Sequence, residues 1–228
     1  MELEAIILAG GLGTRLRSVV SDIPKAMAPV AGRPFLEYVL EYLSRQGFYR
    51  IILAVGYKKE MVKDHFGTSF QNVYLTYSDE EELLGTGGAI RRALNLVNST
   101  LCFVLNGDTW IKLDFRTVFK THLKHGPHIT VVVHKVPDVG RYGAVEVRKD
   151  RVAKFSEKGL SGAGYINAGV YLISPSIFLG YSLPEVFSFE RDFLSPNTDA
   201  LLPFAFKAKG QFIDIGIPED YERAQRMF

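Results

Sequence analysis

The stretch Ala5-Ile6-Ile7-Leu8-Ala9 leads directly into Gly10-Gly11-Leu12-Gly13-Thr14-Arg15, and Pro24-Lys25 follows further along the chain. The apolar run predicts a buried strand. The glycines let the backbone turn tightly and bring its N–H groups close to a ligand, and consecutive N–H groups form a concavity that binds anions. Arg15 adds a planar cation and Lys25 a point charge. The stretch therefore predicts a strand followed by a turn that binds a polyphosphate.

This turn differs from two widespread phosphate-binding motifs. The string Gly-x-x-x-x-Gly-Lys-Ser/Thr does not occur in the chain. The pattern Gly-x-Gly-x-x-Gly fails because Leu16 stands where, counting from Gly11, the third glycine belongs. The second expected strand also ends in Val55-Gly56-Tyr57-Lys58, without the acidic residue that would bind a ribose. A dinucleotide-dependent dehydrogenase is therefore disfavoured.

Length and composition restrict the class of protein. At 228 residues the chain is expected to form one domain. A formal net charge of +2 argues against a nucleic acid polymer as a partner. No apolar run is long enough to span a membrane, and the acidic start of the chain does not resemble a signal peptide. The single cysteine, Cys102, lies in an apolar run and is interpreted as a core residue. These properties fit a cytoplasmic enzyme and leave a homodimer open.

The first half of the chain alternates between strand and helix patterns. Expected strands cover residues 5–9, 51–55, 73–77 and 101–105. Three helices are expected between them. The first begins at Pro34 and ends at Gly47, and the other two cover residues 58–66 and 86–96. Continuous apolar strands separated by helices predict an α/β fold with a Rossmann-like, doubly wound, mostly parallel sheet that is covered on both faces. Ligands of such sheets bind at the carboxyl ends of the strands.

The second half is richer in strands, which are expected over residues 129–134, 144–147, 152–155, 166–173 and near 211–214. Pro175 and Ser176 are expected to start a short helix, and Pro218 a final one. His122, His125 and His128 have a spacing of three, but Gly126-Pro127 breaks any helix between them. We interpret His122 and His125 as an exposed helix end and not as metal ligands.

Two aspartates are candidate metal ligands. Asp108 follows Asn106-Gly107 at the expected carboxyl end of a strand, where it could also form an Asx turn or cap at Thr109. Asp214 lies between apolar residues, where an unpaired charge would be costly. Because magnesium prefers carboxylates together with phosphate oxygens, the two aspartates predict a Mg²⁺ site.

A second glycine-rich turn, Leu84-Gly85-Thr86-Gly87-Gly88-Ala89, precedes an expected helix. Taken alone, it fits a flexible loop in which Thr86 caps the helix. Two such turns at strand ends of one sheet favour a single nucleotide lying between them.

The combination of Gly10-Gly11-Leu12-Gly13-Thr14-Arg15-Leu16, Pro24-Lys25, Asn106-Gly107-Asp108 and Asp214-Ile215-Gly216-Ile217-Pro218 resembles the signature of the sugar-phosphate nucleotidyltransferases. These enzymes join a nucleoside triphosphate to a sugar 1-phosphate and release pyrophosphate. The resemblance covers nearly the whole chain. It implies one GT-A-like nucleotidyltransferase domain, with residues 1–110 forming the nucleotide-binding half and residues 111–228 a sugar-phosphate-binding half.

The resemblance also assigns roles to residues at matching positions. It implies Arg15 and Lys25 as catalytic cations and Asp108 and Asp214 as metal ligands. The implied nucleotide-binding residues are Leu8, Ala9, Gly10, Gly11, Gly13, Thr14, Gly85, Thr86, Gly87 and Asp108. The implied sugar-phosphate-binding residues are Asn106, Tyr142, Gly143, Glu157, Lys158 and Asn167. Without the resemblance, Arg141-Tyr142-Gly143 fits a simple turn and Glu157-Lys158 a solvated charged pair.

Within this family, four strings look most like those of the D-glycero-α-D-manno-heptose 1-phosphate guanylyltransferases, which implies GTP as the nucleotide and a product used in capsule or surface-layer glycans. They are residues 22–29, 84–90, 105–109 and 187–190. The same chemistry with mannose 1-phosphate and GTP, N-acetylmuramate 1-phosphate and UTP, or glucose 1-phosphate and another nucleotide stays open. A regulatory subunit that only binds sugar nucleotides is disfavoured because Arg15, Lys25 and both aspartates are present.

Overall fold

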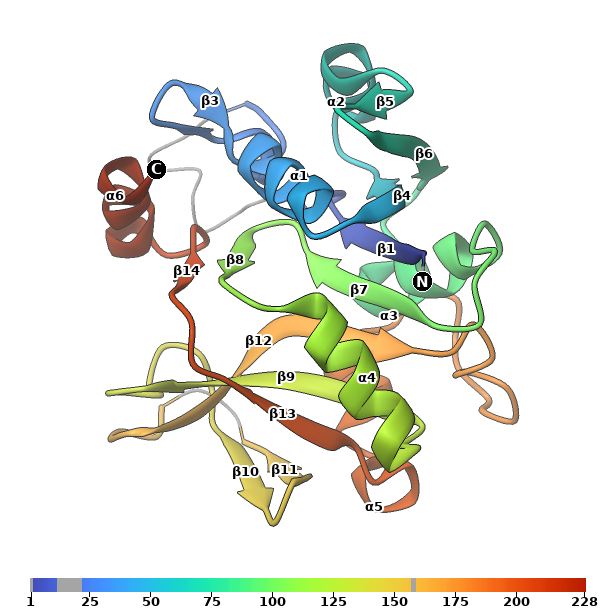
Figure 1. Cartoon of the computed structure of the whole chain (residues 1–228), viewed down its shortest axis with the longest axis vertical. Coiled ribbons are helices and arrows are strands. Elements are labelled where there is room, and N and C mark those ends of the chain that lie inside the picture. Colours follow the sequence, from blue (N-terminus) through green and yellow to red (C-terminus); the bar gives the residue numbers. More distant parts are fainter. Residues whose placement is uncertain (1, 12–21, 157–158) are drawn as a thin grey trace.

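A computed structural model describes residues 2–11, 22–156 and 159–228 of the chain. Within these residues, a ten-stranded mixed sheet with the order β10-β11-β13-β9-β12-β7-β1-β4-β6-β5 runs through the molecule (Figure 1). Its strands in chain order are β1 (Leu3–Leu8), β4 (Phe48–Val55), β5 (Ser69–Phe70), β6 (Val73–Asp79), β7 (Cys102–Asn106), β9 (Ile129–Val136), β10 (Val145–Arg148), β11 (Arg151–Phe155), β12 (Gly164–Ile173) and β13 (Phe204–Ala208). Two short ribbons stand beside it and pair β2 (Pro29–Val30) with β3 (Arg33–Pro34), and β8 (Thr109–Ile111) with β14 (Phe212–Asp214).

The first half of the sheet has the predicted arrangement. Strand β1 pairs in parallel with β4 on one side and β7 on the other, and β4 pairs in parallel with β6. In this register Ala5 lies between Ile51 and Phe103. The glycine turn after β1 and the Asn106-Gly107-Asp108 string therefore share one edge of the sheet.

The expectation of a mostly parallel, doubly wound sheet is wrong for the second half. Strand β12 runs antiparallel between β7 and β9, and β10 and β11 form an antiparallel hairpin. Only two residues connect β10 to β11, a length that permits an antiparallel partner and is far too short for a parallel crossover. Because β13 is the one strand there that pairs in parallel, with β9, the described sheet is mixed.

Helices cover both faces of the sheet. They are α1 (Phe35–Arg45), α2 (Lys59–Phe66), α3 (Gly85–Leu94), α4 (Phe115–His125), α5 (Thr198–Leu201) and α6 (Pro218–Met227), with a 3₁₀ turn at Lys25–Met27 and a π-helix at Phe189–Leu194. Pro34 and Pro218 stand at the starts of α1 and α6, as predicted. The predicted helix at Pro175 is absent from the described chain, because its residues form isolated turns that Gly180 ends with a φ of +85°.

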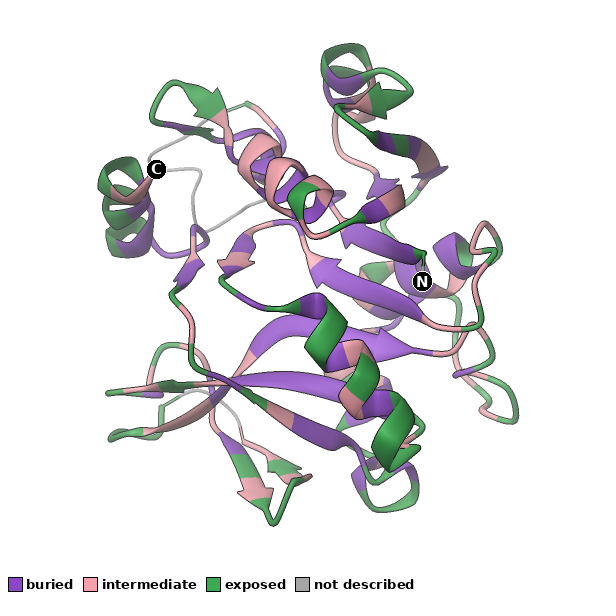
Figure 2. Ribbon diagram, viewed as in Figure 1, coloured by how far each residue is buried: buried purple, intermediate pink, exposed green. Residues whose placement is uncertain are grey.

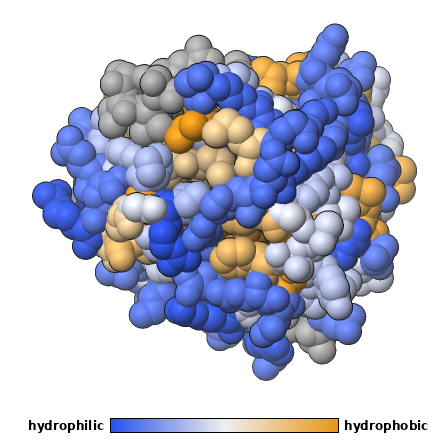
Figure 3. All heavy atoms as spheres, turned by 90° about the horizontal axis from the view of Figure 1, so that it is seen from above, coloured by the Kyte–Doolittle hydropathy of each residue, from blue (hydrophilic) through white to orange (hydrophobic). Residues whose placement is uncertain are grey.

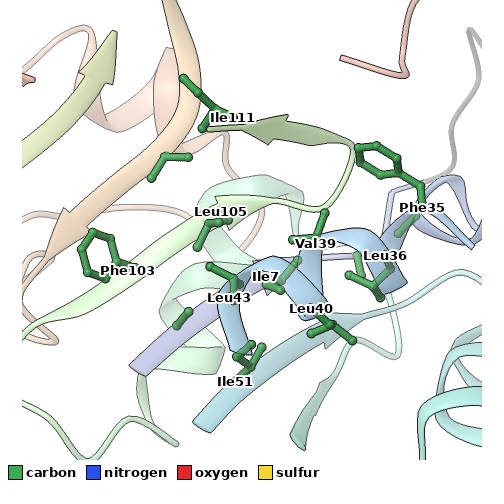
Figure 4. Close-up of a cluster of buried hydrophobic side chains, with 14 of the residues drawn as sticks. Ile7, Phe35, Leu36, Val39, Leu40, Leu43, Ile51, Phe103, Leu105 and Ile111 are labelled. Atoms are coloured by element: carbon green, nitrogen blue, oxygen red, sulfur yellow. The ribbon is translucent and has the colours of Figure 1, made fainter. Parts of the chain in front are cut away.

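Strand residues alternate between two apolar cores, and Figure 2 shows the buried sheet between partly exposed helices. Ile7, Ile51 and Leu105 face a core that also holds the buried side of α1. In Figure 4, Leu36, Val39, Leu40 and Leu43 of α1 point toward these strands. Cys102 faces the other core with Ile6 and Ile52, and burial raises the pKa of its thiol. The prediction of a sheet buried on both faces and of a core cysteine is confirmed.

The outer surface of the chain is mainly polar. In the view from above, hydrophilic side chains predominate and apolar ones gather in smaller patches (Figure 3). Among the described residues, no helix has both the length and the apolar character that crossing a bilayer requires.

The histidine interpretation needs one correction. Helix α4 ends at His125, which is exposed, but His122 is only 4% exposed and its Nδ1 lies 2.9 Å from Thr130 Oγ1. The sequence spacing does not distinguish His122 from His125. His122 is buried because β9 packs over it, and this contact between α4 and β9 cannot be seen in the pattern of α4 alone. Among the described residues, no group of three His, Cys, Asp or Glu side chains forms a metal site.

Burial of His122 predicts a pH-dependent stability. Burial lowers the pKa of its imidazole below 6.5, so the folded state binds fewer protons than the unfolded state in mildly acidic solution. This stabilisation is fully present above pH 6.5 and is lost as pH falls toward the folded pKa, by up to about 1.4 kcal/mol per pH unit. In denaturant unfolding between pH 5 and 7, roughly the range around the histidine pKa, the difference between the native protein and His122→Asn should shrink as pH falls. A constant difference would contradict the prediction.

Candidate active site

A cavity of about 170 Å³ opens at the carboxyl ends of β1 and β7. It collects residues from four separate parts of the chain, and most of them belong to the predicted nucleotide and metal sites. The residues lining it are Leu8, Ala9, Gly11, Lys25, Ala26, Thr86, Asn106, Gly107 and Asp108. Both glycine-rich turns therefore meet at one cavity, together with a lysine and an aspartate.

Lys25 is held at the cavity by the 3₁₀ turn Lys25–Met27, in which the Met27 N–H donates to the Pro24 carbonyl at 2.8 Å. Its side chain is 14% exposed. The ammonium donates a hydrogen bond to the Asp108 carboxylate and lies 3.9 Å from Asp214 Oδ1. Three of the four predicted charged groups of the site therefore converge.

Asp214 reaches this position through a strand pair that the sequence did not reveal. Strand β14 pairs antiparallel with β8, which places Asp214 opposite Thr109. The Ile215 N–H donates to the Asp108 carbonyl at 3.0 Å, and the Gly216 N–H donates to Asp214 Oδ1 at 2.7 Å. Backbone bonds therefore fix the two carboxylates beside each other, although 106 positions separate them.

Close packing at Gly107 sets the depth of the cavity. The Gly107 N–H donates to the Leu8 carbonyl at 3.0 Å, and a Cβ at this position would lie 2.6 Å from the same oxygen. Any larger residue would push β7 away from β1 at the point where Asp108 leaves the sheet. Glycine at this position therefore brings the Asp108 turn next to the end of β1.

The second glycine-rich turn begins α3, but Thr86 does not cap the helix, because Leu84 holds the capping position. Instead, the turn is bonded to the segment 187–190. The Gly87 N–H donates to the Phe187 carbonyl at 2.9 Å, and the Phe187 N–H donates to the Leu84 carbonyl at 3.0 Å. The turn is thus an ordered part of the cavity wall.

Gly87→Ala should damage this wall. The new Cβ would overlap the buried Phe187 ring, and overpacking of this kind costs about 1–3 kcal/mol. We expect a lower thermal midpoint together with weaker nucleotide binding. Gly56→Ala is the matched control, since its Cβ would meet its nearest atoms at 3.4–3.6 Å. Equal thermal midpoints for the two variants would argue against tight packing at Gly87.

The Glu80 side chain lies between the two glycine-rich turns and approaches Gly10 of the first and Leu84 of the second. Its residue is 8% exposed, its Oε2 accepts from the Leu84 N–H at 3.0 Å, and its Oε1 occupies the space 2.7 Å from where a Gly10 Cβ would lie. Burial raises the pKa of its carboxyl, although the hydrogen bond from the Leu84 N–H lowers it by a smaller amount. Sequence reasoning missed Glu80 because it belongs to the acidic run 79–82, which has the composition of a solvated surface loop.

Tyr142 and Gly143 lie in the loop between β9 and β10. They are not among the residues that line the 170 Å³ cavity. The Tyr142 hydroxyl donates to Asp220 Oδ2 at 2.5 Å, and Asp220 is 4% exposed and also paired with Arg223 at 3.2 Å. Burial, followed by the Asp220 contact, raises the pKa of Tyr142. The loop is therefore bonded to α6, directly after the strand that carries Asp214.

Asn106 and Asn167, two of the predicted sugar-binding residues, approach each other across β7 and β12. Asn106 lines the cavity, and Gly169 packs against its side chain, since a Cβ there would lie 2.6 Å from Asn106 Nδ2. Asn167 Oδ1 accepts from the Gly169 N–H at 3.0 Å. Gly13, Thr14, Arg15, Glu157 and Lys158 lie outside the described residues, so their predicted roles stay predictions.

The model of the family described as nucleotidyl transferase matches residues 4–228. The chain is similar to D-glycero-alpha-D-manno-heptose 1-phosphate guanylyltransferase of Aneurinibacillus thermoaerophilus, at 45% identity over 98% of this chain and 97% of that protein. The enzyme of the same name from Campylobacter jejuni is also 45% identical, over 96% and 97%. The crystal structure of HddC from Yersinia pseudotuberculosis complexed with GMP-PN has a TM-score of 0.89 at 40% identity, covering 99% of both chains.

Proposed function

The chain belongs to the nucleotidyl transferase family, and from this premise we propose that it transfers GMP from GTP to D-glycero-α-D-manno-heptose 1-phosphate and releases pyrophosphate. The predicted resemblance to the sugar-phosphate nucleotidyltransferases is confirmed. The choice of GTP and of the heptose phosphate is supported by the two 45% identical relatives and by the nucleotide in the similar crystal structure.

The observation that carries the proposal is that Lys25 and Asp108 line one cavity between two glycine-rich turns, and that Lys25 also approaches Asp214. An ammonium and backbone N–H groups suit the negative charge of a triphosphate. A dead binding subunit would not need this arrangement of charges. The chemistry therefore points to transfer at a phosphoryl group.

The reaction requires no general base, since the sugar phosphate is already ionised at neutral pH. One of its oxygens attacks the α-phosphorus of GTP, the bond from this phosphorus to the β-phosphate oxygen breaks, and pyrophosphate leaves in line. Catalysis then consists of positioning and of stabilising charge in the transition state. In this proposal Lys25 would stabilise the developing charge on the α-phosphoryl group, and Arg15 would hold the leaving pyrophosphate.

Asp108 and Asp214 fit a Mg²⁺ ion. Mg²⁺ usually takes one or two carboxylates and completes its shell with water and substrate phosphate oxygens, and here two carboxylates are fixed side by side by the β8–β14 pair. When bound, the ion would neutralise charge on the nucleotide and on the incoming phosphate. Lys25 would give up its place between the carboxylates and turn toward the α-phosphate.

We assign the sugar phosphate to the side of the cavity that Asn106 lines. Asn106 Oδ1 is buried and, among the described residues, has no hydrogen-bond partner. Since an unsatisfied buried oxygen is costly, it fits a residue that gains its partner from a substrate. The resemblance adds Tyr142, Gly143 and Asn167 as further sugar-phosphate residues, with Glu157 proposed for the hydroxyls and Lys158 for the phosphate.

The test is a screen of the four nucleoside triphosphates against heptose, mannose, glucose and N-acetylmuramate 1-phosphates, with products identified by mass. The proposal expects GDP-heptose and stoichiometric pyrophosphate. Another nucleotide sugar would retain the reaction and change the substrates. Nucleotide binding without pyrophosphate release would instead indicate a regulatory subunit.

A further inference from the structure

Strand β12 of the sugar side and the Thr86 turn of the nucleotide side are connected through one acidic side chain. Glu190 lies in the π-helix Phe189–Leu194 and does not line the 170 Å³ cavity. Its Oε2 accepts from Thr86 Oγ1 at 3.0 Å, and its Oε1 accepts from the Tyr171 hydroxyl at 2.8 Å. One carboxylate therefore has a bond to each side of the site.

The connection continues to the predicted sugar-binding residues. Asn167 Nδ2 donates to the Tyr171 hydroxyl at 2.6 Å, and Asn167 Oδ1 accepts from Gly169 N–H at 3.0 Å. The latter bond fixes which way the amide points. Gly169 has a φ of +68°, and the register of β12 shifts between Asn167 and Tyr171. This bulge places Gly169 against Asn106, so the chain of contacts begins at Thr86 and ends at Asn106, and both of these residues line the cavity.

Hydrogen bonds give Thr86, Tyr171 and Asn167 a defined direction, whereas Asn106 Oδ1 has no partner among the described residues. Thr86 Oγ1 accepts from the Phe189 N–H at 2.8 Å, so its own proton is free to go to Glu190. Tyr171 is fully buried, and burial, followed by the Glu190 charge, raises its pKa well above the usual value, which keeps the hydroxyl protonated as a donor. Networks of this kind in a buried setting rigidify the groups that they join.

We propose that Glu190 is a positioning residue that couples the nucleotide turn to the sugar strand, so that binding of one substrate orders the wall for the other. The proposal rests on the proposed function. A ligand that fixes Thr86 also fixes Glu190, Tyr171 and Asn167, and the second ligand then meets a wall that is already ordered. The coupling acts in both directions, because linkage between two binding events is reciprocal.

The measurement is calorimetric binding of α,β-methylene GTP, which cannot react, with and without saturating D-glycero-α-D-manno-heptose 1-phosphate. In the native protein we expect the sugar phosphate to tighten nucleotide binding by about 5-fold or more, within the range typical of coupled sites. In Tyr171→Phe the Thr86–Glu190 bond remains but the link to Asn167 is gone. The nucleotide Kd alone should stay within about twofold, and the tightening by the sugar phosphate should fall toward onefold.

Glu190→Gln gives an intermediate case, since an amide has one acceptor oxygen where the carboxylate has two. In the native geometry its oxygen faces either Thr86 or Tyr171, and an NH₂ donor faces the other hydroxyl, so Glu190→Gln should keep part of the coupling that Glu190→Ala loses. Tyr181→Phe is the matched control, because Tyr181 packs on Phe193 at 5.0 Å in the same apolar cluster. It should leave the coupling unchanged.

The outcomes separate the two proposals. Native-like coupling in Tyr171→Phe, or no coupling in the native protein, would overturn the role of Glu190 while leaving the transfer reaction in place. Failure of the native protein to bind the GTP analogue would instead remove the proposed function. Loss of coupling in Tyr181→Phe as well would show that general loosening of the cluster is responsible, and it would also count against Glu190.

Discussion

Asp108→Asn is expected to remove nearly all turnover, with kcat/KM lower by about 10³-fold or more at any practical Mg²⁺ concentration. The carboxylate is one of the two that we propose as ligands of a divalent cation, and the β8–β14 pair brings their segments together. A metal ion supplies several kcal/mol of charge stabilisation in phosphoryl transfer, and each 1.4 kcal/mol corresponds to about tenfold in rate. The amide keeps the size of the side chain and loses its charge. Pyrophosphate release across a Mg²⁺ titration measures the effect.

A second measurement separates loss of metal from loss of fold. Binding of Mn²⁺ in the presence of the GTP analogue, followed by electron paramagnetic resonance, should weaken in Asp108→Asn. Asp199→Asn, an exposed aspartate at the start of α5, is the control and should bind Mn²⁺ as the native protein does. Substantial turnover of Asp108→Asn in the presence of a chelator would remove Asp108 from the metal site.

Lys25→Met is expected to lower kcat by about 10²- to 10³-fold, the range seen when one preorganised donor to a transition state is removed. Methionine is close to lysine in length, so the packing around the 3₁₀ turn is largely kept. Because Lys25 contacts both Asp108 and Asp214 in the free protein, its loss leaves two carboxylates facing each other. We therefore expect a somewhat lower thermal midpoint and tighter Mn²⁺ binding without substrate.

The control for Lys25→Met is Lys112→Met, because Lys112 is exposed and lies next to β8. Its turnover should match that of the native protein. Near-native kcat in Lys25→Met would place Lys25 outside the chemical step, and a loss confined to KM would make it a binding residue only.

Local patterns in the sequence predicted most of the parallel half of the fold. Apolar runs bounded by turns located β1, β4, β6 and β7 to within a few residues, because strands buried on both faces carry a continuous apolar signal. Pro34 and Pro218 marked two helix starts, because the missing N–H of proline costs nothing at the start of a helix. The antiparallel half was less accessible, since the partner of each strand depends on contacts between distant segments.

The site shows the same division. The glycine turns and Asp108 could be placed from their positions after expected strands, and Asp214 from its unusual setting among apolar neighbours. Glu190 and Tyr171 carried no comparable signal, although Glu190 belongs to a string that we compared with the family. Tyr171 appears as one more aromatic residue in an apolar strand, and only the fold shows that its hydroxyl lies between Asn167 and Glu190.

The β8–β14 pair also determines when the protein becomes competent during its synthesis. In the order of synthesis, Lys25 and Asp108 precede residue 214 by more than 100 positions. Until β14 leaves the ribosome and pairs with β8, Lys25 and Asp108 lack the neighbouring Asp214 carboxylate. A partly made chain that lacks β14 is therefore expected to lack the carboxylate pair that the proposed reaction needs.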